Sequence, residues 1–253
     1  MARKVLIVGL GLMGGSYAAA LSSAGYEVGG ISDRREALDF ALRKGWIASG
    51  HTSPDHDYIG RFDIVVSALY PRVFVDWVRS NGKYLRRGAI LTDVSGVKAC
   101  VVPVVQEMLG GRAEFVPAHP MAGREFSGIE NSDASIFKGA NFIITPTLRN
   151  TPENIAVVED MARDMGFGKI SSLSPEKHDE MVGFLSQLTH CIAVALMTCK
   201  DSRHLVDYTG DSFRDLTRIA RINEEMWTEL FLENREELLG QMDLFMDRFG
   251  ELR

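Results

Sequence analysis

KVLIVGLGLMGGS, residues 4–16, decides the fold of this chain. Its first five residues form a short β-branched apolar run, which predicts a buried parallel strand. The strand leads directly into a GxGxxG pattern at residues 9–14, and residues 17–24 follow with a helical pattern. A glycine motif between a strand and a helix favours a dinucleotide-binding turn over a glycine-rich turn without a ligand.

The three glycines of this turn have separate tasks. Gly9 makes the tight turn, Gly11 lets a pyrophosphate approach the backbone, and Gly14 lets the helix pack on the strand. The free N–H groups at the start of the helix favour the phosphates. The residues of the turn that we expect to bind the cofactor are Gly9, Gly11, Leu12, Met13 and Gly14.

A second strand, Glu27–Ile31, ends at the position where an adenosine ribose is usually bound. Asp33 would accept hydrogen bonds from a ribose 2′-hydroxyl and so favours NAD. Ser32 and Arg34 could instead receive a 2′-phosphate, which favours NADP. Both signals are present, so the expected cofactor is NAD or NADP, with NAD favoured.

Strands and helices continue to alternate through the first half of the chain. Strand patterns occur at residues 63–68, 89–92, 113–117 and 140–145, and helical patterns at residues 37–44 and 72–81. They predict an α/β fold of the Rossmann type, with about seven strands in one sheet and helices on both faces. Ligands of such sheets bind beyond the carboxyl ends of the strands. Ala68 and Leu69, which follow one strand, are therefore expected to line the cofactor cleft.

His119 stands in a second informative stretch, PAHPMAG at residues 117–123. Proline fixes its own φ and biases the residue before it toward extended backbone, so His119 should be held at the end of an extended segment. A positioned imidazole beside a cofactor site can abstract a proton. The alternative is a buried histidine that caps a loop.

Composition restricts the class of partner. A formal net charge of −6 argues against a nucleic acid or an anionic membrane surface. Three cysteines show neither a disulfide framework nor a metal-ligand spacing, which fits a reducing cytoplasm. We expect no bound metal, no signal peptide and no membrane span.

The pattern changes after residue 146. Helical patterns occupy residues 153–165, 176–196, 213–219 and 224–249, without an alternating strand pattern. We therefore expect two domains, a dinucleotide-binding domain at residues 1–148 and an all-helical substrate-binding domain at residues 149–253. Long apolar helix faces in a domain of about 100 residues favour a homodimer through that domain over a purely internal core.

One long helix of the second domain carries polar residues at helical spacing. The residues expected on one face are Asp179, Gly183, Ser186 and His190. Buried polar groups must be satisfied or used, so this face predicts a pocket wall. Farther on, Arg218 lies among apolar residues and is a candidate carboxylate clamp, because a guanidinium binds a carboxylate through two parallel hydrogen bonds. Arg214 is expected to make a surface ion pair with Asp211 or Asp215.

These segments together resemble the prephenate/arogenate dehydrogenases of tyrosine biosynthesis. The matching segments, in order, are VGLGLMGGS, TDVSGVK, HPMAG, ITPT, SPEKHD, SQLTH, FRDLTRIA, EMW and FLEN. They cover nearly the whole chain, and their order and spacing are more specific than the glycine motif alone.

The resemblance implies a Rossmann-type domain joined to a helical domain, the 6-phosphogluconate-dehydrogenase-like arrangement. It also implies an NAD(P)-dependent oxidoreductase that carries out an oxidative decarboxylation, in which a ring alcohol carbon gives hydride to nicotinamide while the ring carboxylate leaves as CO2. The expected function is prephenate dehydrogenase, which forms 4-hydroxyphenylpyruvate from a small anionic substrate. The alternative is arogenate (cyclohexadienyl) dehydrogenase, which forms tyrosine directly.

The resemblance also assigns roles to single residues. His119 corresponds to the catalytic base or hydrogen-bond acceptor for the ring hydroxyl, and Arg218 to the residue that holds a carboxylate. Asp179 corresponds to an acidic residue that supports the pocket. The remaining residues expected at the substrate are His190, Trp227, Ser95, Gly96 and Gln187.

Three positions depart from the pattern of the family. Gln187 stands where a histidine is common, and its amide can donate a hydrogen bond but cannot titrate. Ser95 precedes Gly96, the reverse of the usual order, which affects the serine contact to the ring hydroxyl. Asp211 adds a negative charge near the expected dianion site and so favours a substrate with an amino group.

Two other functions fit parts of the sequence. A 3-hydroxyacid dehydrogenase shares the GLGLMG start and a helical second domain, but the long helix offers no lysine comparable to the one such enzymes use. A non-catalytic dinucleotide-sensing protein would suit the altered Gln187 and Gly96 positions. The presence together of His119, His190 and Arg218 favours an enzyme, because a charged residue among apolar neighbours is costly unless it is used.

Overall fold

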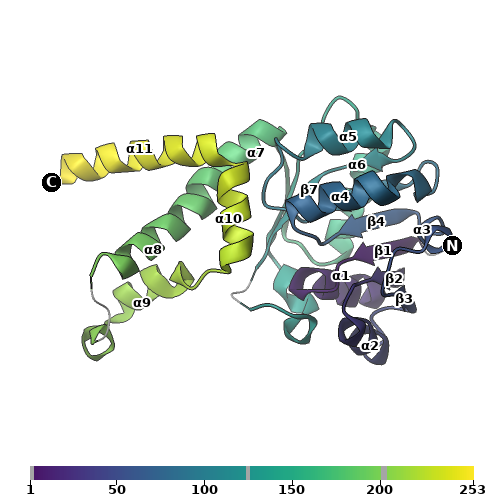
Figure 1. Ribbon diagram of the computed structural model, residues 1–253, viewed down its shortest axis with the longest axis horizontal. Coiled ribbons are helices and arrows are strands. Elements are labelled where there is room, and N and C mark those ends of the chain that lie inside the picture. The colour runs from purple at the N-terminus through teal and green to yellow at the C-terminus, as the bar shows by residue number, and fades with distance from the viewer. Residues whose placement is uncertain (1–2, 124–125, 201–203) are drawn as a thin grey trace. The chain divides into compact units, whose positions relative to one another are not determined.

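The chain folds as two compact units, Met1–Pro175 and Glu176–Arg253. The computed structural model, drawn in Figure 1, describes residues 3–123, 126–200 and 204–253. Arg124 and Glu125, which follow the PAHPMAG stretch, lie outside the described residues.

The larger sheet of the first unit contains six parallel strands in the part of the chain that the structure describes, in the order β3-β2-β1-β4-β5-β6. This order is that of the Rossmann fold and confirms the expected fold class. The central strands β1 and β4 are mostly apolar and buried, because helices cover both faces of the sheet. The strands are β1 (Lys4–Val8), β2 (Glu27–Ile31), β3 (Ser49–His51), β4 (Ile64–Ser67), β5 (Ile90–Asp93) and β6 (Glu114–Phe115).

Helices connect these strands and lie on both sides of the sheet. Figure 1 shows α1 and α2 on one side and α4 and α5 on the other. A proline at the first helical position starts both α4 and α6, where its missing N–H would have no intrahelical partner. The helices are α1 (Leu12–Ser23), α2 (Arg35–Arg43), α3 (His56–Ile59), α4 (Pro71–Asn81), α5 (Val102–Leu109) and α6 (Pro152–Asp164).

A second, smaller sheet follows in the same unit. It contains β7 (Ala118–Met121), β8 (Asn141–Ile144) and β9 (Lys169–Ser172). β7 pairs antiparallel with β8, and β8 pairs parallel with β9. The prediction that residues 140–145 extend the main sheet is therefore wrong, because β8 pairs with β7. No strand was expected at β9, since Ile170 is the only apolar residue in it.

The first unit extends beyond the boundary expected after residue 148. Helix α6 packs on α1, and its buried residues Val158, Met161 and Ala162 belong to the core of this unit. β9 then pairs with β8, so the division between the units falls after Pro175. The helical pattern of residues 153–165 is confirmed as α6, but its apolar face is buried in the first unit.

Aromatic rings from distant segments meet in the core of the first unit. Phe137 is fully buried, and its ring lies 5.1 Å from the ring of Tyr17 and 4.9 Å from that of Phe167, measured between centroids. Phe142 of β8 lies 4.9 Å from Phe167. These contacts join α1, the smaller sheet and the end of α6 in one core.

The second unit is helical throughout its described residues, as expected. The helix expected at residues 176–196 contains a π-helical segment, η4, in its middle. The helix expected at residues 224–249 is interrupted at Asn234, which lies outside helical geometry at φ −120° and ψ 31°. The elements are α7 (Pro175–Val182), η4 (Gly183–Leu188), α8 (Thr189–Thr198), η5 (Leu205–Tyr208), α9 (Asp211–Thr217), η6 (Arg218–Ala220), α10 (Glu224–Glu233) and α11 (Arg235–Leu252).

Several helices of this unit keep apolar faces exposed. On α11, residues spaced by 4, 3, 4 and 3 form one apolar row, called the α11 seam: Leu238, Met242, Phe245, Phe249 and Leu252. Leu238 is buried, whereas Phe249 is 63% exposed. A row with this spacing is typical of a helix that packs against another helix.

The continuous helix Pro175–Thr198 is, by length and composition, long and apolar enough to cross a membrane. Its most apolar window has a mean hydropathy of 1.5 and is 28% buried. We expected no such segment, because no uninterrupted apolar run in the sequence is long enough to span a membrane. The polar residues Ser186, Gln187 and His190 interrupt the run in this helix, but a hydropathy averaged over the window can still be high. The core helix of a soluble protein passes the same test.

Phe137→Ala should lower the free energy of unfolding by about 3–5 kcal/mol, because it leaves a cavity among the rings of the core. Thermal and urea unfolding followed by circular dichroism would measure this. Leu148→Ala is the control, since Leu148 is fully exposed and its removal should leave the transition unchanged. Equal transitions for the two variants would contradict the placement of Phe137 at the centre of the core.

Candidate active site

The carboxyl ends of four strands are level across the main sheet. The register places Ile31, Val8, Ser67 and Asp93 in one row. The chain segments that follow these residues all leave the sheet at the same edge. They are the glycine turn, the segment at Ser32, the segment at Ala68 and the DVSGVK segment, and ligands of such sheets bind beyond this edge.

The glycine turn packs directly against the segment after β4. Gly9 has φ +92°, and a Cβ placed on it would lie 2.8 Å from the carbonyl oxygen of Ala68. A Cβ on Gly14 would lie 1.8 Å from the carbonyl oxygen of Gly9. Both positions therefore exclude side chains. Ala68 and Leu69, which we expect to line the cofactor cleft, form one wall of the turn.

Gly11 has a different environment, because a Cβ on it would meet no atom within 4 Å. Helix α1 begins at the next residue, with no side chain capping its N-terminus and no acidic residue in its first turn. Open space beside the N–H groups of a helix N-terminus fits a pyrophosphate. Leu12 and Met13, the first two residues of α1, are partly exposed at this position.

The three residues expected at the ribose differ in exposure. Ser32 is buried, and its Oγ accepts a hydrogen bond from the backbone N–H of Arg34 at 3.3 Å. Asp33 and Arg34 are exposed immediately after β2. The hydroxyl of Ser32 thus shapes the turn, and the carboxylate of Asp33 is the exposed acceptor that suits a ribose.

A buried ion pair lies at the end of β5. Asp93 and Lys98 are 1% and 0% exposed, and Nζ of Lys98 lies 2.6 Å from Oδ2 of Asp93. Oδ2 of Asp93 also accepts from the backbone N–H of Ser95 at 3.1 Å. Charges buried to this extent need several partners to offset the loss of water, and here the partners come from backbone groups as well.

The same pair holds the strand that carries His119. Oδ1 of Asp93 accepts from the backbone N–H of Ala118 at 3.1 Å, and Nζ of Lys98 donates to the carbonyl oxygen of Ala118 at 2.6 Å. Both backbone polar groups of the residue before His119 are therefore held by one ion pair. His119 itself pairs with Ile143 of β8 and is partly exposed, between the buried Ala118 and Pro120.

Ser95 and Gly96 lie in the loop between Asp93 and Lys98. Ser95 is buried, and its Oγ donates to the carbonyl oxygen of Val97 at 2.9 Å, while Gly96 is partly exposed. The predicted contact of Ser95 with a ring hydroxyl remains a prediction. Beneath the loop, burial raises the pKa of the Tyr17 hydroxyl well above its ordinary value, and the charge of Asp93 adds to the shift. Tyr17 is therefore neutral.

In the second unit, the imidazole of His190 is oriented by two contacts. Its Nδ1 lies 2.8 Å from the carbonyl oxygen of Ser186, and its ring centroid lies 3.8 Å from that of Trp227 at an angle of 32°. A carbonyl oxygen can only accept, so Nδ1 carries a proton and Nε2 is the acceptor of the neutral ring. Two expected substrate residues, His190 and Trp227, are thus brought together.

Two other expected substrate residues are buried inside this unit. Asp179 is 2% exposed, and its Oδ1 lies 2.7 Å from Nδ1 of His178. Gln187 is 1% exposed, and its amide is bonded to Leu230 and Asn234. The structure thus gives the amide of Gln187 internal partners, and its predicted contact with substrate stays a prediction.

The π-helical segment interrupts the regular helix on which the expected common face of Asp179, Gly183, Ser186 and His190 depends, and that face stays a prediction. Spacing of 4, 3 and 4 residues aligns side chains only in a regular α-helix, and a π segment winds with i→i+5 bonds. Gly183 lies inward, where a Cβ would be 3.6 Å from Nδ2 of Asn234. Asp179, which precedes the segment in the chain, is buried, whereas His190, which follows it, is partly exposed.

The two arginines of α9 and η6 have different surroundings. Arg214 is ion-paired with Asp211 on the surface, as expected. Arg218 is exposed at the start of η6, just after the last residue of α9. Its role as a carboxylate clamp remains a prediction.

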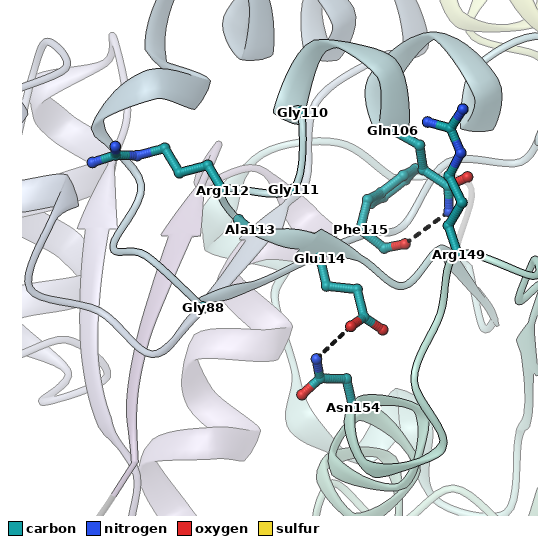
Figure 2. A pocket seen from close by; sticks show the side chains of 10 residues that line it. All are labelled: Gly88, Gln106, Gly110, Gly111, Arg112, Ala113, Glu114, Phe115, Arg149 and Asn154. Atoms are coloured by element: carbon teal, nitrogen blue, oxygen red, sulfur yellow. Dashed lines mark hydrogen bonds between the residues drawn. The ribbon is translucent and has the colours of Figure 1, made fainter.

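One pocket of about 290 Å³ lies elsewhere in the first unit (Figure 2). Gly88 and Gly111, which line it, precede β5 and β6, so it lies at the amino ends of these strands. Figure 2 shows Glu114 bonded to Asn154 of α6, at 2.7 Å, with Arg112 and Arg149 extending in different directions. The pocket is therefore separate from the strand ends that carry the glycine turn and His119.

Models of known families match both units. The nucleotide-binding domain of prephenate dehydrogenase matches residues 17–170, and the dimerization domain of prephenate dehydrogenase matches residues 174–253. The chain belongs to the prephenate dehydrogenase family. It is accordingly an NAD(P)-dependent oxidoreductase of the prephenate/arogenate dehydrogenase type, which confirms the predicted family, class of enzyme and cofactor class.

Individual relatives are similar over nearly the whole chain. A cyclohexadienyl dehydrogenase of Zymomonas mobilis is 29% identical, over 99% of this chain and 87% of the relative. A prephenate dehydrogenase of Lactococcus lactis is 28% identical, over 99% of this chain and 70% of the relative. The solved prephenate dehydrogenase of A. aeolicus, in complex with hydroxyphenyl propionate and NAD+, is 32% identical, with a TM-score of 0.89 over 100% of this chain and 90% of that one.

Sequence reasoning missed three residues of this dehydrogenase that organise the site regions. In the sequence, Asp93 and Lys98 are noted only as members of the TDVSGVK segment, and Asn234 only as the last residue of FLEN. A lysine next to a run of apolar residues, as in VKACVVPVV, could have indicated a buried cation, because such a charge is costly without a partner. No local signal marks Asn234, since its partners lie far away in the sequence.

Lys98→Met should lower the free energy of unfolding by about 3 kcal/mol or more, because it leaves the buried carboxylate of Asp93 without its counter-charge. Urea unfolding would measure the change. Lys4→Met is the matched control: Lys4 pairs with Glu27 at the surface, both about half exposed, and its loss should cost under about 1 kcal/mol. A cost for Lys98→Met no larger than that of the control would contradict the importance of the buried pair.

Asp33→Ser should raise the KM for NAD+ about tenfold and improve the use of NADP+ relative to NAD+, because the carboxylate favours a 2′-hydroxyl and repels a 2′-phosphate. Steady-state kinetics with both cofactors would test it. Glu36→Ser, a nearby exposed acid on α2, should change neither KM. An unchanged cofactor ratio in Asp33→Ser would show that Asp33 does not contact the ribose.

Proposed function

We propose that this enzyme converts prephenate to 4-hydroxyphenylpyruvate and CO2 with reduction of NAD+. The observation that supports this most is the placement of His119. Its strand begins at Ala118, which is held by the Asp93–Lys98 pair at the same sheet edge from which the glycine turn emerges. A dinucleotide site and a positioned imidazole at one edge are what a hydride-transfer reaction with proton removal needs.

In the proposed reaction, His119 accepts the proton of the ring hydroxyl. The carbon that bears this hydroxyl loses a hydride, for which bound NAD+ is the acceptor. The electron pair of the bond to the ring carboxylate then completes the aromatic ring as CO2 leaves, and the ring oxygen takes the proton back from His119 to give the phenol. His119 is partly exposed. The backbone N–H and carbonyl oxygen of the preceding residue, Ala118, are both hydrogen-bonded, so the strand that carries the imidazole is held in place for proton transfer.

We assign substrate binding to two residues of the second unit. Arg218, exposed at the start of η6, holds a carboxylate of the substrate through its guanidinium. The imidazole of His190, which Ser186 orients through Nδ1, contacts a polar group of the substrate. Trp227 supports the imidazole from the side by ring contact.

Prephenate is proposed over arogenate on one observation. Asp211 would favour the amino group of arogenate if its charge were unbalanced. Instead, the guanidinium of Arg214 pairs with it, which offsets the negative charge. The preference for NAD+ rests on Asp33, which is the exposed residue at the end of β2 that can accept from a ribose.

We also propose that the enzyme acts as a homodimer through its helical unit. Beyond the buried Leu238, the α11 seam is partly or fully exposed in a single chain, and the matching family domain is a dimerization domain. A second copy would cover the exposed apolar faces of α11 and Pro175–Thr198, so no lipid is needed to do so. A cytoplasmic location, and the absence of nucleic-acid and membrane partners, stay predictions from the composition.

Turnover should be measured by the absorbance of the reduced nicotinamide, with prephenate and arogenate each combined with NAD+ and NADP+. Prephenate with NAD+ should give the highest kcat/KM. His119→Asn should lower kcat by roughly a hundredfold or more, because the proton acceptor is lost, and leave binding of NAD+ unchanged. Calorimetric titration with NAD+ would check the binding.

A higher kcat/KM for arogenate would overturn the choice of substrate but not the reaction. No turnover with any pair, together with tight binding of NAD+, would support a dinucleotide-sensing protein instead. A His119→Asn variant with wild-type kcat would remove His119 from the reaction.

A further inference from the structure

Two buried side-chain amides connect the helices of the second unit. Asn234 is 5% exposed and Gln187 is 1% exposed. Nδ2 of Asn234 donates to Oε1 of Gln187 at 2.8 Å and to the carbonyl oxygen of Asp179 at 2.9 Å. Nε2 of Gln187 donates to the carbonyl oxygen of Leu230 at 3.0 Å. Buried polar groups that lose such partners are costly, so these bonds constrain the helices that they join.

The amides occupy special backbone positions. Gln187 lies in the π-helical segment, and Asn234 lies at the break between α10 and α11. Because the chain changes direction at Asn234, its side chain reaches the π segment, against which α11 also packs. The pair therefore connects the break between α10 and α11 to the π segment.

The bond from Gln187 to Leu230 is adjacent to the contact between His190 and Trp227. His190 follows Gln187 by three residues, and Trp227 precedes Leu230 by three. The hydrogen bond and the ring contact are therefore successive contacts between the same two helical segments, which run in opposite directions. A shift at one contact moves the other.

We propose that Gln187 and Asn234 are positioning residues for His190. They hold α10 so that Trp227 stays against the imidazole, and this keeps Nδ1 on the carbonyl oxygen of Ser186. The inference rests on the proposed function, in which His190 binds the substrate. It also explains the choice of glutamine, because one amide donates to Leu230 and accepts from Asn234 at the same time.

Two variants remove the bonds in different ways. Asn234→Ala deletes the bridging amide, and Gln187→Met keeps the length of the side chain without its polar groups. Each should lower kcat/KM for prephenate about tenfold, through a higher KM for prephenate, because the imidazole is no longer held. The KM for NAD+ should not change, since the glycine turn lies in the first unit. Arg235→Ala, an exposed neighbour, is the matched control and should behave as wild type.

A second readout is independent of turnover. The fluorescence emission of Trp227 is obtained by subtracting the emission of a protein that carries Trp227→Phe from the emission of the same protein without that change. An imidazole against an indole quenches its emission, so Asn234→Ala and Gln187→Met should increase the Trp227 contribution. Arg235→Ala should leave it unchanged. Circular dichroism would show that each variant is folded.

The outcomes separate the two proposals. Unchanged Trp227 emission and unchanged KM for prephenate in a folded Gln187→Met or Asn234→Ala variant would overturn the positioning role. Loss of stability alone, with wild-type emission and kinetics, would also overturn it, since it would show a purely structural role. Changed emission in a protein that turns over neither prephenate nor arogenate would support the positioning role and overturn the proposed function.

Discussion

A desolvated ion pair, Asp93 with Lys98, is the constraint on which the first unit's site depends. Two opposite charges without water offer little net stability, but separating them is expensive. The pair therefore admits few alternative arrangements of the atoms around it. Those atoms include the backbone of Ser95 and both polar groups of Ala118, so the loop after β5 and the start of β7 are fitted together. A residue that must transfer a proton benefits from this rigidity more than from added stability.

Much of the fold could be predicted because its signals are local. β1 and β4 are short apolar runs followed by a turn or a helix, and the glycine pattern of the first turn is recognised from its own spacing directly after β1. The smaller sheet could not be predicted in this way. β8 looks like any apolar strand, and only its pairing with β7, about twenty residues earlier, separates it from the main sheet. β9 exists because β8 offers it an edge, not because its own sequence is strand-like.

In the candidate site, too, the features with local sequence signals were predictable and those that depend on distant residues were not. His119, the glycine turn and the pairing of Arg214 with Asp211 were predictable from residue type and short spacing. The function of Lys98 depends on Ala118, and that of Asn234 depends on Asp179 and Gln187, which are more than forty residues away. The burial of Gln187 could not be predicted, because residue type does not reveal burial. The sequence comparison with a family supplied the reaction, whereas the physical roles of these amides came only from the fold.

The π-helical segment at Gly183–Leu188 has a consequence for how this helix can change over evolution. Such a segment is equivalent to one additional residue accommodated within a helix. Deletion of one residue there would convert the segment to regular α-helix and leave the later side chains of α8 near their present faces. A one-residue change that the segment did not absorb would turn those side chains by about 100° relative to α7, since each residue advances an α-helix by that angle, and His190 would leave Trp227. The π segment is therefore the place where this helix can change in length by one residue and keep the contact between the two rings.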